Sequence, residues 1–542
     1  MDKTDSSRIA VPSTTSRPTT NAGSSEASTE ADSGSANPST SPPTKPGHSA
    51  ASSPLDEQEL PDQAEGEENQ PVPYLKGFEI FVDQFGKACI STDARRNRRT
   101  YRVGSKDANK LIRRNARKEG TKIKRLDLAE INEALLDHAE TDGKRCKVFY
   151  RIAPTKDGIE IDLGTEDHAR VRISPGTVQI VFEESKTYFN RTVEMLPIRV
   201  SENAGNCRLL KKYLINISAT DRLLLLAWVS YVLAHPKISS TAFLILVLLG
   251  GQGAGKTTLT KLLSRIIDPR IVGVQVMPLN LKDLVIAAQH AHLLCYDNLR
   301  AFRGSFSDIL AVMVTGGAIV LRKLYTDDEQ HIVHVHVALI LNSLHEIINE
   351  SDLAQRSLPI RLNPLSESDR VSESKLEHDL EIDLPIITRG TYELIGKIFK
   401  HLPDVKVTHP ERMIDFSKWL AAMEMVDDAP PGAYQSLYSE NLVEAQLESL
   451  LANPLAAALI DFAQGRRNTW EGKPTELLTE LNDVTPFAMQ RSPEWPKNSI
   501  ALGRRISSLQ ASLKTQGIEI RQTRGQHRKI TVTTTEILNE EY

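Results

Sequence analysis

The run AFLILVLLGGQGAGKTTLTKLLSRII, residues 242–267, constrains the fold of this chain more than any other feature. Its apolar start predicts a buried strand, and the amphipathic pattern at its end predicts a helix. The loop between them has the spacing Gly250-x-x-x-x-Gly255-Lys256-Thr257, which is the phosphate-binding loop motif. A plain glycine turn is the alternative, but the full spacing between a strand and a helix argues against it. The run therefore predicts an α/β P-loop NTPase domain.

Each residue type in this loop has a chemical reason. Glycines let backbone N–H groups wrap the phosphates, and the N-terminus of the next helix adds positive potential. The Lys256 ammonium is expected to reach the β- and γ-phosphates, and the Thr257 hydroxyl is expected to ligate Mg²⁺. ATP and Mg²⁺ are therefore the expected cofactors. The residues predicted to bind them are Gly250, Gly253, Gly255, Lys256, Thr257 and Thr258.

The stretch LLCYDN, residues 293–298, predicts a second buried strand behind the loop. Asp297 near its end is predicted to hold Mg²⁺, although an apolar run ending in Asp also closes many ordinary strands. Many ATPases place a second carboxylate next, whereas this chain has Asn298. An amide takes up no proton near neutral pH, so Asn298 is expected to aim a water molecule and not to act as a strong base. Alternatively, the base is another residue such as Glu346 or Glu350.

A third apolar stretch, VHVALILNSLHE, predicts a strand that ends at Asn342. Asn342 is expected to orient the attacking water; a turn-forming Asn is the alternative. The next segment, DLAQR, carries Arg356, a candidate arginine finger for a neighbouring subunit, with a surface salt bridge as the alternative and Arg361 as a lesser candidate. The predicted catalytic residues are Lys256, Asp297, Asn298, Asn342 and Arg356.

The segment between the second and third strands, TGGAIVLRKLYTDDEQHIVHVHV, predicts a hairpin or a pair of strands. Arg322 and Lys323 lie within it. In a channel they would contact the phosphates of a single DNA strand, while the alternative is an ordinary solvated hairpin.

The order of these motifs resembles the superfamily 3 helicase type of AAA+ domain. More narrowly, it is similar to ATP-binding and primase-helicase-like proteins of phages, plasmids and prophages. The resemblance covers about residues 200–365 and implies a homo-oligomeric ring, often a hexamer, that moves along single-stranded DNA. It assigns the phosphate lysine, the magnesium hydroxyl, the magnesium carboxylate, the sensor and the finger, in this order, to Lys256, Thr257, Asp297, Asn342 and Arg356.

Two features depart from these relatives. The first is Asn298. The second is the absence of a primase motif, so primer synthesis is not predicted. Four acidic residues upstream are expected only at strand edges and in a turn; they are Glu160, Asp162, Glu166 and Asp167.

Composition and patterning divide the chain into successive parts. The predicted parts are a disordered Ser/Thr/Pro-rich and acidic tail at 1–71, an α+β accessory domain with a basic patch at 72–200, a helical linker at 201–239, the P-loop ATPase domain at 240–365, a helical lid or bundle at 366–452 and a C-terminal winged-helix-like domain at 453–542.

Three basic features favour a nucleic-acid partner. The first surrounds Tyr101, the second is expected on one helix face, and the third lies on the longest helix and the wing of the C-terminal domain. Solvated basic faces, or a protein-contact role for the winged helix, are the alternatives. The first two features comprise Arg95, Arg96, Arg98, Arg99 and Arg102, and then Arg113, Arg114, Arg117 and Lys118. The residues of the third that are predicted to contact DNA are Arg504, Arg505, Arg524 and Arg528.

The bulk composition narrows the setting. The chain has 542 residues and a formal net charge of -4, with hydrophobic residues at 40%, which is ordinary for a globular protein. Four cysteines without a CxxC pair argue against a zinc site or a disulfide framework and favour a reducing cytosol. LLLLAWVSYVLA, from Leu223, is too short to span a membrane and predicts a buried helix. We therefore expect a cytoplasmic protein with no membrane partner.

The sequence favours an ATP-dependent DNA helicase or translocase that serves replication of a mobile element or prophage. A nucleotide-gated regulatory or phage-defence ATPase without motor activity is the second hypothesis, and Asn298 is compatible with its slow hydrolysis. A small-molecule kinase is the third, and the strands beyond the loop and the basic C-terminal part argue against it.

Overall fold

The chain divides into two units, residues 1–68 and 69–542. The first unit lies outside the described residues, and the tail predicted to be disordered lies outside them too. The computed structural model describes residues 72, 75–92, 99–182, 186–237, 240–300, 304–322, 330–344, 347–348, 351–466, 469–523 and 528–534.

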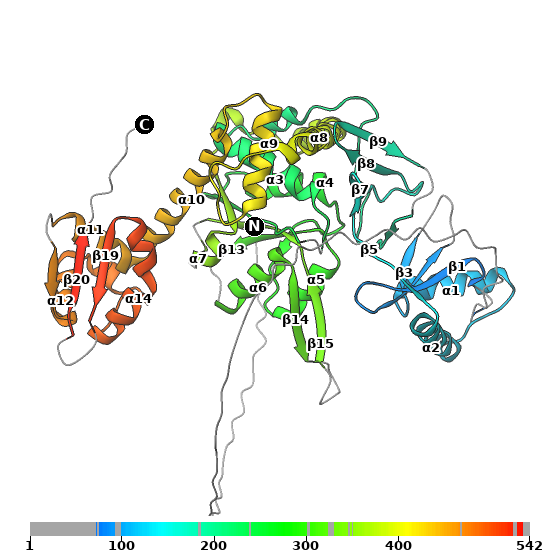
Figure 1. The fold of residues 1–542 in the computed structure, drawn as a ribbon, viewed down its shortest axis with the longest axis horizontal. Helices are drawn as coiled ribbons and strands as arrows, with labels where there is room; N and C mark the ends of the chain where they lie inside the picture. Colours follow the sequence, from blue (N-terminus) through cyan, green and yellow to red (C-terminus); the bar gives the residue numbers. More distant parts are fainter. Residues whose placement is uncertain are drawn as a thin grey trace, which may run out of the picture. The chain divides into compact units, whose positions relative to one another are not determined.

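The N-terminal module is a small sheet covered by two helices (Figure 1). The strand order is β3-β2-β1-β4, with antiparallel pairs except β1 and β4, which are parallel. Its own core gathers Ile90 from the sheet, Ile112 from α1 and Leu135 from α2. The bounds are β1 Phe78–Val82, β2 Ala88–Thr92, β3 Thr100–Arg102, α1 Lys106–Lys118, α2 Arg125–Thr141 and β4 Lys144–Arg145.

A second sheet follows as an antiparallel meander, β6-β7-β8-β9. Its tight turns contain the Asp-Gly and Pro-Gly pairs that the sequence suggests, and Gly176 has φ 73°, which a residue with a side chain rarely adopts. Separately, β5 and β10 form a short parallel pair. The bounds are β5 Val148–Phe149, β6 Ile152–Thr155, β7 Gly158–Asp162, β8 Arg170–Ser174, β9 Thr177–Val181 and β10 Tyr188–Phe189.

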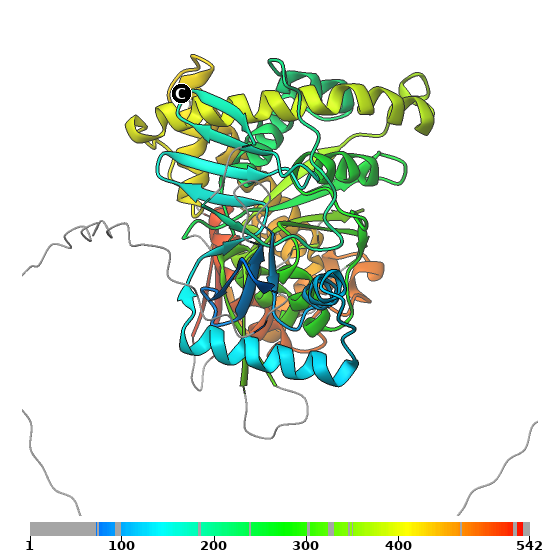
Figure 2. The ribbon, with the colours of Figure 1, turned by 90° about the vertical axis from the view of Figure 1, so that its right-hand side faces the viewer.

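This meander shares one hydrophobic cluster with the residues that follow it, not with the N-terminal module. The long helix α8, Glu373–His401, lies along β8 and β9, as Figure 2 shows in yellow-green and cyan. The Gly176 amide donates to Gly396 O on this helix at 2.7 Å. The accessory region at 72–200 therefore contains two separate cores.

The central sheet has five parallel strands in the order β12-β13-β16-β11-β17. Strands β11 and β16 are almost wholly buried, as apolar runs in a covered parallel sheet must be. The helices and strands are α3 Ala219–Ala234, β11 Ile245–Gly250, α4 Lys256–Ile267, β12 Gln275–Val276, α5 Leu281–Gln289, β13 Leu293–Leu299, α6 Gly304–Thr315, β14 Gly317–Arg322, β15 Gln330–Val335, β16 Ala338–Ser343, α7 Ser351–Ala354 and β17 Ser357–Leu362.

Two predictions of local structure within this region are confirmed. Strands β14 and β15 pair as an antiparallel hairpin, which extends away from the parallel sheet in Figure 1. Helix α3 is buried, and its Trp228 donates to Leu244 O at 2.9 Å. No helix in the described part of the chain is both long enough and apolar enough to span a bilayer.

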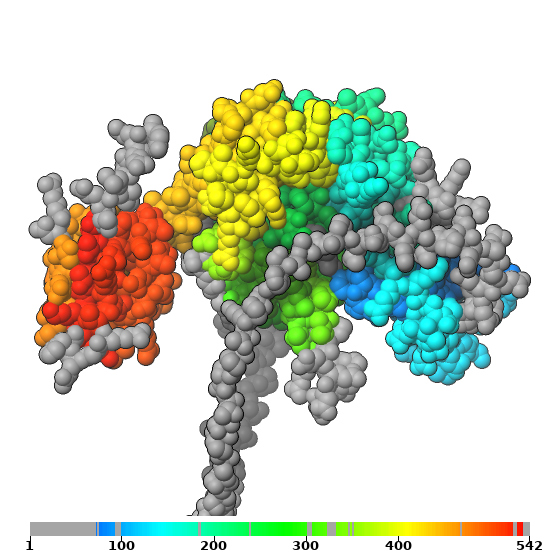
Figure 3. Space-filling model, in the orientation of Figure 1, coloured from blue at the N-terminus to red at the C-terminus, as the bar shows by residue number. Residues whose placement is uncertain are grey.

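Three long helices, α8, α9 and α10, lie between residues 373 and 452. A C-terminal module with its own core follows them (Figure 3, orange to red). This module contains a three-stranded sheet, β18-β20-β19, and its elements follow one another as helix, strand, three helices, strand and strand. The bounds are 3-10 helix η2 Cys207–Tyr213, η3 Glu367–Asp369, η4 Leu402–Asp404, α9 Ile414–Val426, α10 Ala433–Ala452, α11 Pro454–Gln464, β18 Trp470–Gly472, α12 Pro474–Val484, α13 Phe487–Gln490, α14 Ser499–Thr515, β19 Ile518–Gln522 and β20 Ile530–Thr534.

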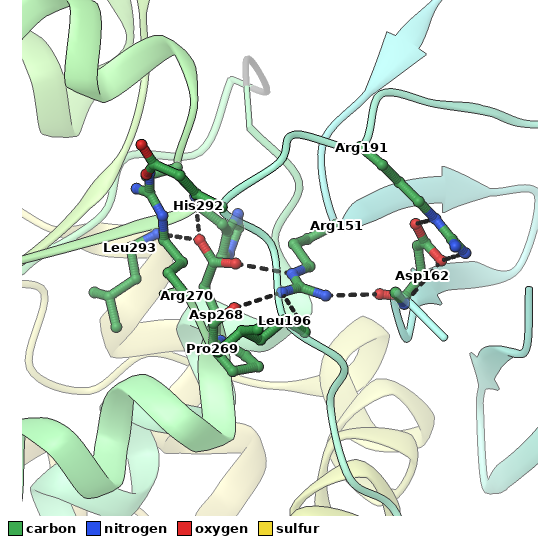
Figure 4. Close-up of polar contacts among 12 residues, drawn as sticks. Arg151, Asp162, Arg191, Leu196, Asp268, Pro269, Arg270, His292 and Leu293 are labelled. Carbon is green, nitrogen blue, oxygen red and sulfur yellow. Dashed lines mark hydrogen bonds and ion pairs between the residues drawn. The ribbon is translucent and has the colours of Figure 1, made fainter. Parts of the chain in front are cut away.

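A buried arginine joins the meander to the central sheet (Figure 4). Arg151 is 0% exposed, and its Nε donates to Asp268 Oδ1 at 2.8 Å. Its Nη2 donates to Leu196 O at 2.6 Å and to Pro269 O at 2.8 Å. The other Asp268 oxygen accepts the amide of His292 at 2.8 Å, just before β13 begins. One guanidinium therefore ties the meander to the end of α4 and, through Asp268, to the start of β13.

Candidate nucleotide site

The glycine-rich loop, residues 250–257, connects the carboxyl end of β11 to the start of α4. Gly253 and Gly255 have φ 78° and 83°, values that explain glycine at both positions. A Cβ at Gly250 would approach Leu362 O to 2.6 Å, so this position also requires glycine. The loop thus presents backbone amides and a helix N-terminus at the carboxyl edge of the sheet, where α/β proteins bind ligands.

Lys256 lies folded over this loop. Its Nζ donates to Gly250 O at 2.6 Å and to Gly251 O at 2.9 Å. Partial burial lowers the pKa of Lys256, and the negative charge of Asp297 opposes that shift. The ammonium is therefore held beside the loop amides by carbonyl contacts that a bound phosphate can replace.

Asp297 is the centre of the polar contacts at the sheet edge. The Thr257 hydroxyl donates to its Oδ2 at 2.6 Å, and Asn342 Nδ2 donates to its Oδ1 at 3.2 Å. The fully buried Asn342 accepts in turn from Thr260 Oγ1 at 2.9 Å. The structure thus brings together Thr257, Asp297 and Asn342, from α4, β13 and β16.

This donor set fits Mg²⁺. The Thr257 hydroxyl and the Asp297 carboxylate offer oxygen atoms, which are the hard ligands that Mg²⁺ prefers. In nucleotide sites Mg²⁺ binds only a few protein oxygens, and phosphates and water supply the other ligands. Among the residues described, no cluster of three or more His, Cys, Asp or Glu side chains forms a separate metal site. The four cysteines, all described, are free.

Asn298 occupies a strained and exposed position. Its φ is 57°, and the pairing of β13 with β16 shifts register between Tyr296 and Leu299, so one extra residue bulges out here. Asn is one of the few residues other than glycine that adopts this conformation at low cost. The Asn298 amide N–H donates to Asp297 Oδ1 at 2.8 Å, so the bulge also fixes the Asp297 carboxylate. The two alternative bases, Glu346 and Glu350, lie outside the described residues.

A groove of about 1240 Å³ opens beside the glycine-rich loop. Gly255 and Thr258 line one side, and Ile215 and Leu365 contribute apolar surface. Asn216 holds the wall in place, because its Nδ2 donates to Ala254 O at 2.9 Å and to Asn363 O at 2.6 Å. This space is large enough for a base and ribose.

Sequence reasoning missed Asn216 and Thr260. Thr260 lies one turn after Lys256 on the same side of α4 and is buried, so the amphipathic pattern gave a usable indication. Asn216 carries no such indication, because its partners lie 38 and 147 residues away in the sequence.

The two arginine-finger candidates are both bound within the chain. Arg356 donates to Asp352 O at 2.9 Å and forms an ion pair with the Asp352 carboxylate, which also pairs with Arg412 at 2.6 Å. Arg361 donates to Glu448 Oε1 at 3.0 Å. Among the described residues, Arg356 has no contact with Asp297, and its recorded partner is Asp352.

The residues that are predicted to contact DNA lie in different parts of the structure. Arg322 ends β14, while Lys323 and Arg524 lie outside the described residues. Arg504 and Arg505 are on α14; Arg504 is exposed, but Arg505 donates to Pro493 O at 2.8 Å. Arg528 is exposed just before β20.

Two of the four acidic residues upstream, Glu160 and Asp162, are buried on β7 and have ion-pair partners. Glu160 accepts from Arg170 Nε at 2.7 Å, and Asp162 accepts from Arg191 Nε at 2.7 Å. These two are therefore buried within the sheet and not at its edges, while Glu166 and Asp167 lie in a turn, as the sequence predicts. Their ion pairs compensate their burial.

A parallel α/β sheet with this loop at its carboxyl edge fits the core of a P-loop helicase. The chain also matches two family models. Residues 208–437 match the actinomycete integrative conjugative element replication protein, and residues 455–540 match the C-terminal domain of the same replication protein. Together the matches cover more than half of the chain, which belongs to this family of replication proteins. The narrower resemblance, to proteins of mobile elements, is confirmed at the level of this family.

Solved structures give weaker likenesses. The NrS-1 C-terminal region is 15% identical with a TM-score of 0.39, covering 86% of this chain and 100% of that one. The SCCmec type IV Cch active helicase is 12% identical with a TM-score of 0.44, covering 84% and 92%. The JCV helicase is 14% identical with a TM-score of 0.23, covering 44% and 65%. TM-scores this low support no inference about this chain. No curated protein matches the sequence.

Proposed function

We propose that this chain is an ATP-dependent DNA helicase or translocase that acts on single-stranded DNA during replication of an integrative element. The observation that carries the proposal is the contact of Thr257 Oγ1 with Asp297 Oδ2 at 2.6 Å, beside the glycine-rich loop. A hydroxyl and a carboxylate in this relation suit the Mg²⁺ of a bound nucleotide. Membership in a replication-protein family supports a role on DNA.

In the proposed mechanism the loop amides and Lys256 hold the β- and γ-phosphates of ATP. Mg²⁺ supplies charge neutralisation, and Thr257 and Asp297 would hold it. Asn342 holds the Asp297 carboxylate and in this mechanism would help to orient water, while Asn298 shapes the bulge beside it. Phosphoryl transfer depends mainly on positioning and charge stabilisation, so an amide at 298 does not prevent hydrolysis.

We further propose a homo-oligomer, with a hexamer as the expected form, in which Arg356 leaves Asp352 and enters the site of a neighbouring subunit. The hairpin formed by β14 and β15 would then contact the DNA strand through Arg322 and Lys323. The helix and strand order of 453–542 suits a winged helix, whose α14 and wing would contact DNA through Arg504 and Arg528. Arg524, also predicted from the sequence to contact DNA, lies outside the described residues. Arg505 is a weaker contact, because it binds the loop before α14.

We keep the proposed domain division with one change. The meander, residues 152–181, is assigned to the ATPase body, because it shares that hydrophobic cluster. Residues 72–145 then form the accessory module proper, since they enclose a core of their own.

A strand-displacement assay tests the proposal. Purified protein with ATP and Mg²⁺ should release a labelled strand from a forked duplex, and Lys256→Ala should not, because it lacks the ammonium that holds the phosphates. ATP binding by the wild-type protein without strand release or translocation would reject the motor.

The second candidate is a nucleotide-gated switch without motor activity. Two observations favour it: residue 298 has no carboxylate, and Arg356 is held by Asp352 in its own chain. Such a switch would oligomerise with ATP, yet its slow hydrolysis would not respond to DNA.

A further inference from the structure

A second groove, of about 880 Å³, lies away from the glycine-rich loop. One wall comes from β3 and α1 of the N-terminal module, and the other from the turn at 164–168 and the segment 191–195. On α1 the lining residues recur at positions 107, 110, 111 and 114, which is one face of a helix. The sequence interpretation put Arg113, Arg114, Arg117 and Lys118 on one helix face, but only Arg114 of these lines the groove.

The groove lining carries more positive than negative charge, with four Arg and Lys side chains against the two carboxylates of Asp107 and Glu166. Arg99 is exposed, and its Nε donates to His168 Nε2 at 3.0 Å. Burial, together with the positive charges of Arg191 and Arg99, lowers the pKa of His168 to about 4, so this partner is neutral at pH 7. Arg114 is also exposed, and among the described residues no carboxylate pairs with either arginine. Lys110, in contrast, pairs with Asp107 at 3.5 Å.

The opposite wall is held rigidly. Arg191 donates to both oxygens of Asp162, at 2.7 and 2.5 Å, and to Thr165 O at 2.6 Å. Figure 4 shows Asp162 between Arg191 and the buried Arg151. The wall is therefore anchored to the same buried guanidinium that joins the meander to the central sheet. Such a wall needs little reordering when a ligand binds.

Aromatic and apolar surface lies among these charges. Tyr101 lines the groove and packs against the core of the N-terminal module, which restrains its ring. Val193 lines the other wall and is 64% exposed. Guanidinium groups bind phosphates, and aromatic rings stack on bases that are not paired within a duplex. A duplex would hide its base faces from this surface.

We propose that this groove binds a single strand of DNA, with phosphates at Arg99 and Arg114 and a base against Tyr101. The proposal rests on the proposed function only in that the chain acts on DNA. It adds a contact site in the accessory module, separate from the hairpin and from the C-terminal module.

Fluorescence anisotropy with the full-length protein tests this site, using a labelled oligo-dT and a duplex of the same length across a salt series. Arg114→Glu should weaken oligo-dT binding at least tenfold. The slope of the logarithm of the binding constant against the logarithm of the salt concentration should become shallower by about 0.7 for each lost phosphate contact. Arg117→Glu is the matched control, since it reverses the same charge on an exposed position of the same helix outside the groove. It should change affinity less than threefold. Both variants should keep the wild-type melting temperature and the ATPase rate without DNA.

A second pair of variants tests stacking. Tyr101→Leu should weaken oligo-dT binding roughly 5- to 100-fold, whereas Tyr101→Phe, which keeps the ring, should stay near wild type. Suppose that the wild-type protein binds oligo-dT, and that Arg114→Glu and Arg117→Glu weaken this binding equally. The groove proposal is then wrong, while the proposed function stands. If the wild-type protein binds no single-stranded DNA at any salt concentration, both fail. A third outcome concerns a polyglutamate peptide. If the protein binds this peptide more tightly than oligo-dT, and Arg114→Glu abolishes the peptide binding, the proposal is wrong and the groove binds an acidic protein partner.

Discussion

The Thr257 hydroxyl and the Asp297 carboxylate lie 2.6 Å apart, although 40 residues separate them in the sequence. Because both groups ligate Mg²⁺ in the proposed mechanism, we expect Asp297→Ala to lower ATP hydrolysis by at least about 100-fold. Thr257→Ser keeps the hydroxyl and should retain most activity, whereas Thr257→Ala should not. The rates of all three variants are measured as steady-state phosphate release at a series of Mg²⁺ concentrations. Equal rates for the Ser and Ala variants would argue against the hydroxyl as a ligand.

The left-handed backbone conformation of Asn298 leads us to expect a different effect from each substitution at this position. Asp and Gly tolerate its φ of 57°, so Asn298→Asp should keep or raise turnover and Asn298→Gly should fold normally. Asn298→Val should lower stability by about 1–3 kcal/mol, because a β-branched residue is strained there. Thermal unfolding and ATPase rates separate the two effects. A large loss of turnover in Asn298→Asp, with unchanged melting, would mean that the amide has a polar role that a carboxylate does not fill.

Arg356 should act between subunits. We expect Arg356→Ala to bind ATP as wild type does but to hydrolyse it at least about 100-fold more slowly, because a finger stabilises only the transition state. Mixing Arg356→Ala with Asp297→Ala should restore part of the activity, since some interfaces then pair an intact site with an intact finger. Arg412→Ala removes another partner of Asp352 and serves as the control. No rescue on mixing would place Arg356 in an intramolecular role.

Arg151 should matter for stability and not for chemistry. Arg151→Met leaves the buried Asp268 carboxylate without its partner, which typically costs about 3–5 kcal/mol. The double variant Arg151→Met/Asp268→Leu should recover part of this loss, because no charge is then buried alone. Urea unfolding followed by tryptophan fluorescence reports the difference. A single variant that unfolds with the wild-type midpoint would show that the ion pair contributes little.

Local patterns in the sequence predicted which polar residues lie together at the edge of the sheet, because strands β13 and β16 carry Asp297 and Asn342 near their carboxyl ends. In a parallel sheet the carboxyl ends of neighbouring strands meet at one edge, so Asp297 and Asn342 had to approach the loop. The αL bulge at Asn298 was not predictable, since it depends on register with β16. Neither was the division of the accessory region, because the meander and the N-terminal module have similar strand patterns. Contacts between residues far apart in the sequence, such as Arg151 with Asp268 and Gly176 with Gly396, reveal which core the meander joins.

The DNA-contact predictions depended on clusters of basic residues, and such clusters do not reveal side-chain partners. Arg504 and Arg505 are adjacent in sequence, yet one is exposed and the other binds backbone carbonyls. Arg113 and Arg114 are likewise adjacent, and only the second lines the groove. The geometry of one helix turn decides both cases, because neighbours in a helix point about 100° apart.

The most direct measurement of the central claim is the ATPase rate of the purified protein with and without single-stranded DNA, beside the Lys256→Ala variant. A motor couples turnover to its track, so the account predicts stimulation of about tenfold or more by the DNA. Lys256→Ala should be inactive under both conditions, because it cannot hold the γ-phosphate. A DNA-independent rate would contradict the motor, and full activity in Lys256→Ala would contradict the nucleotide site itself.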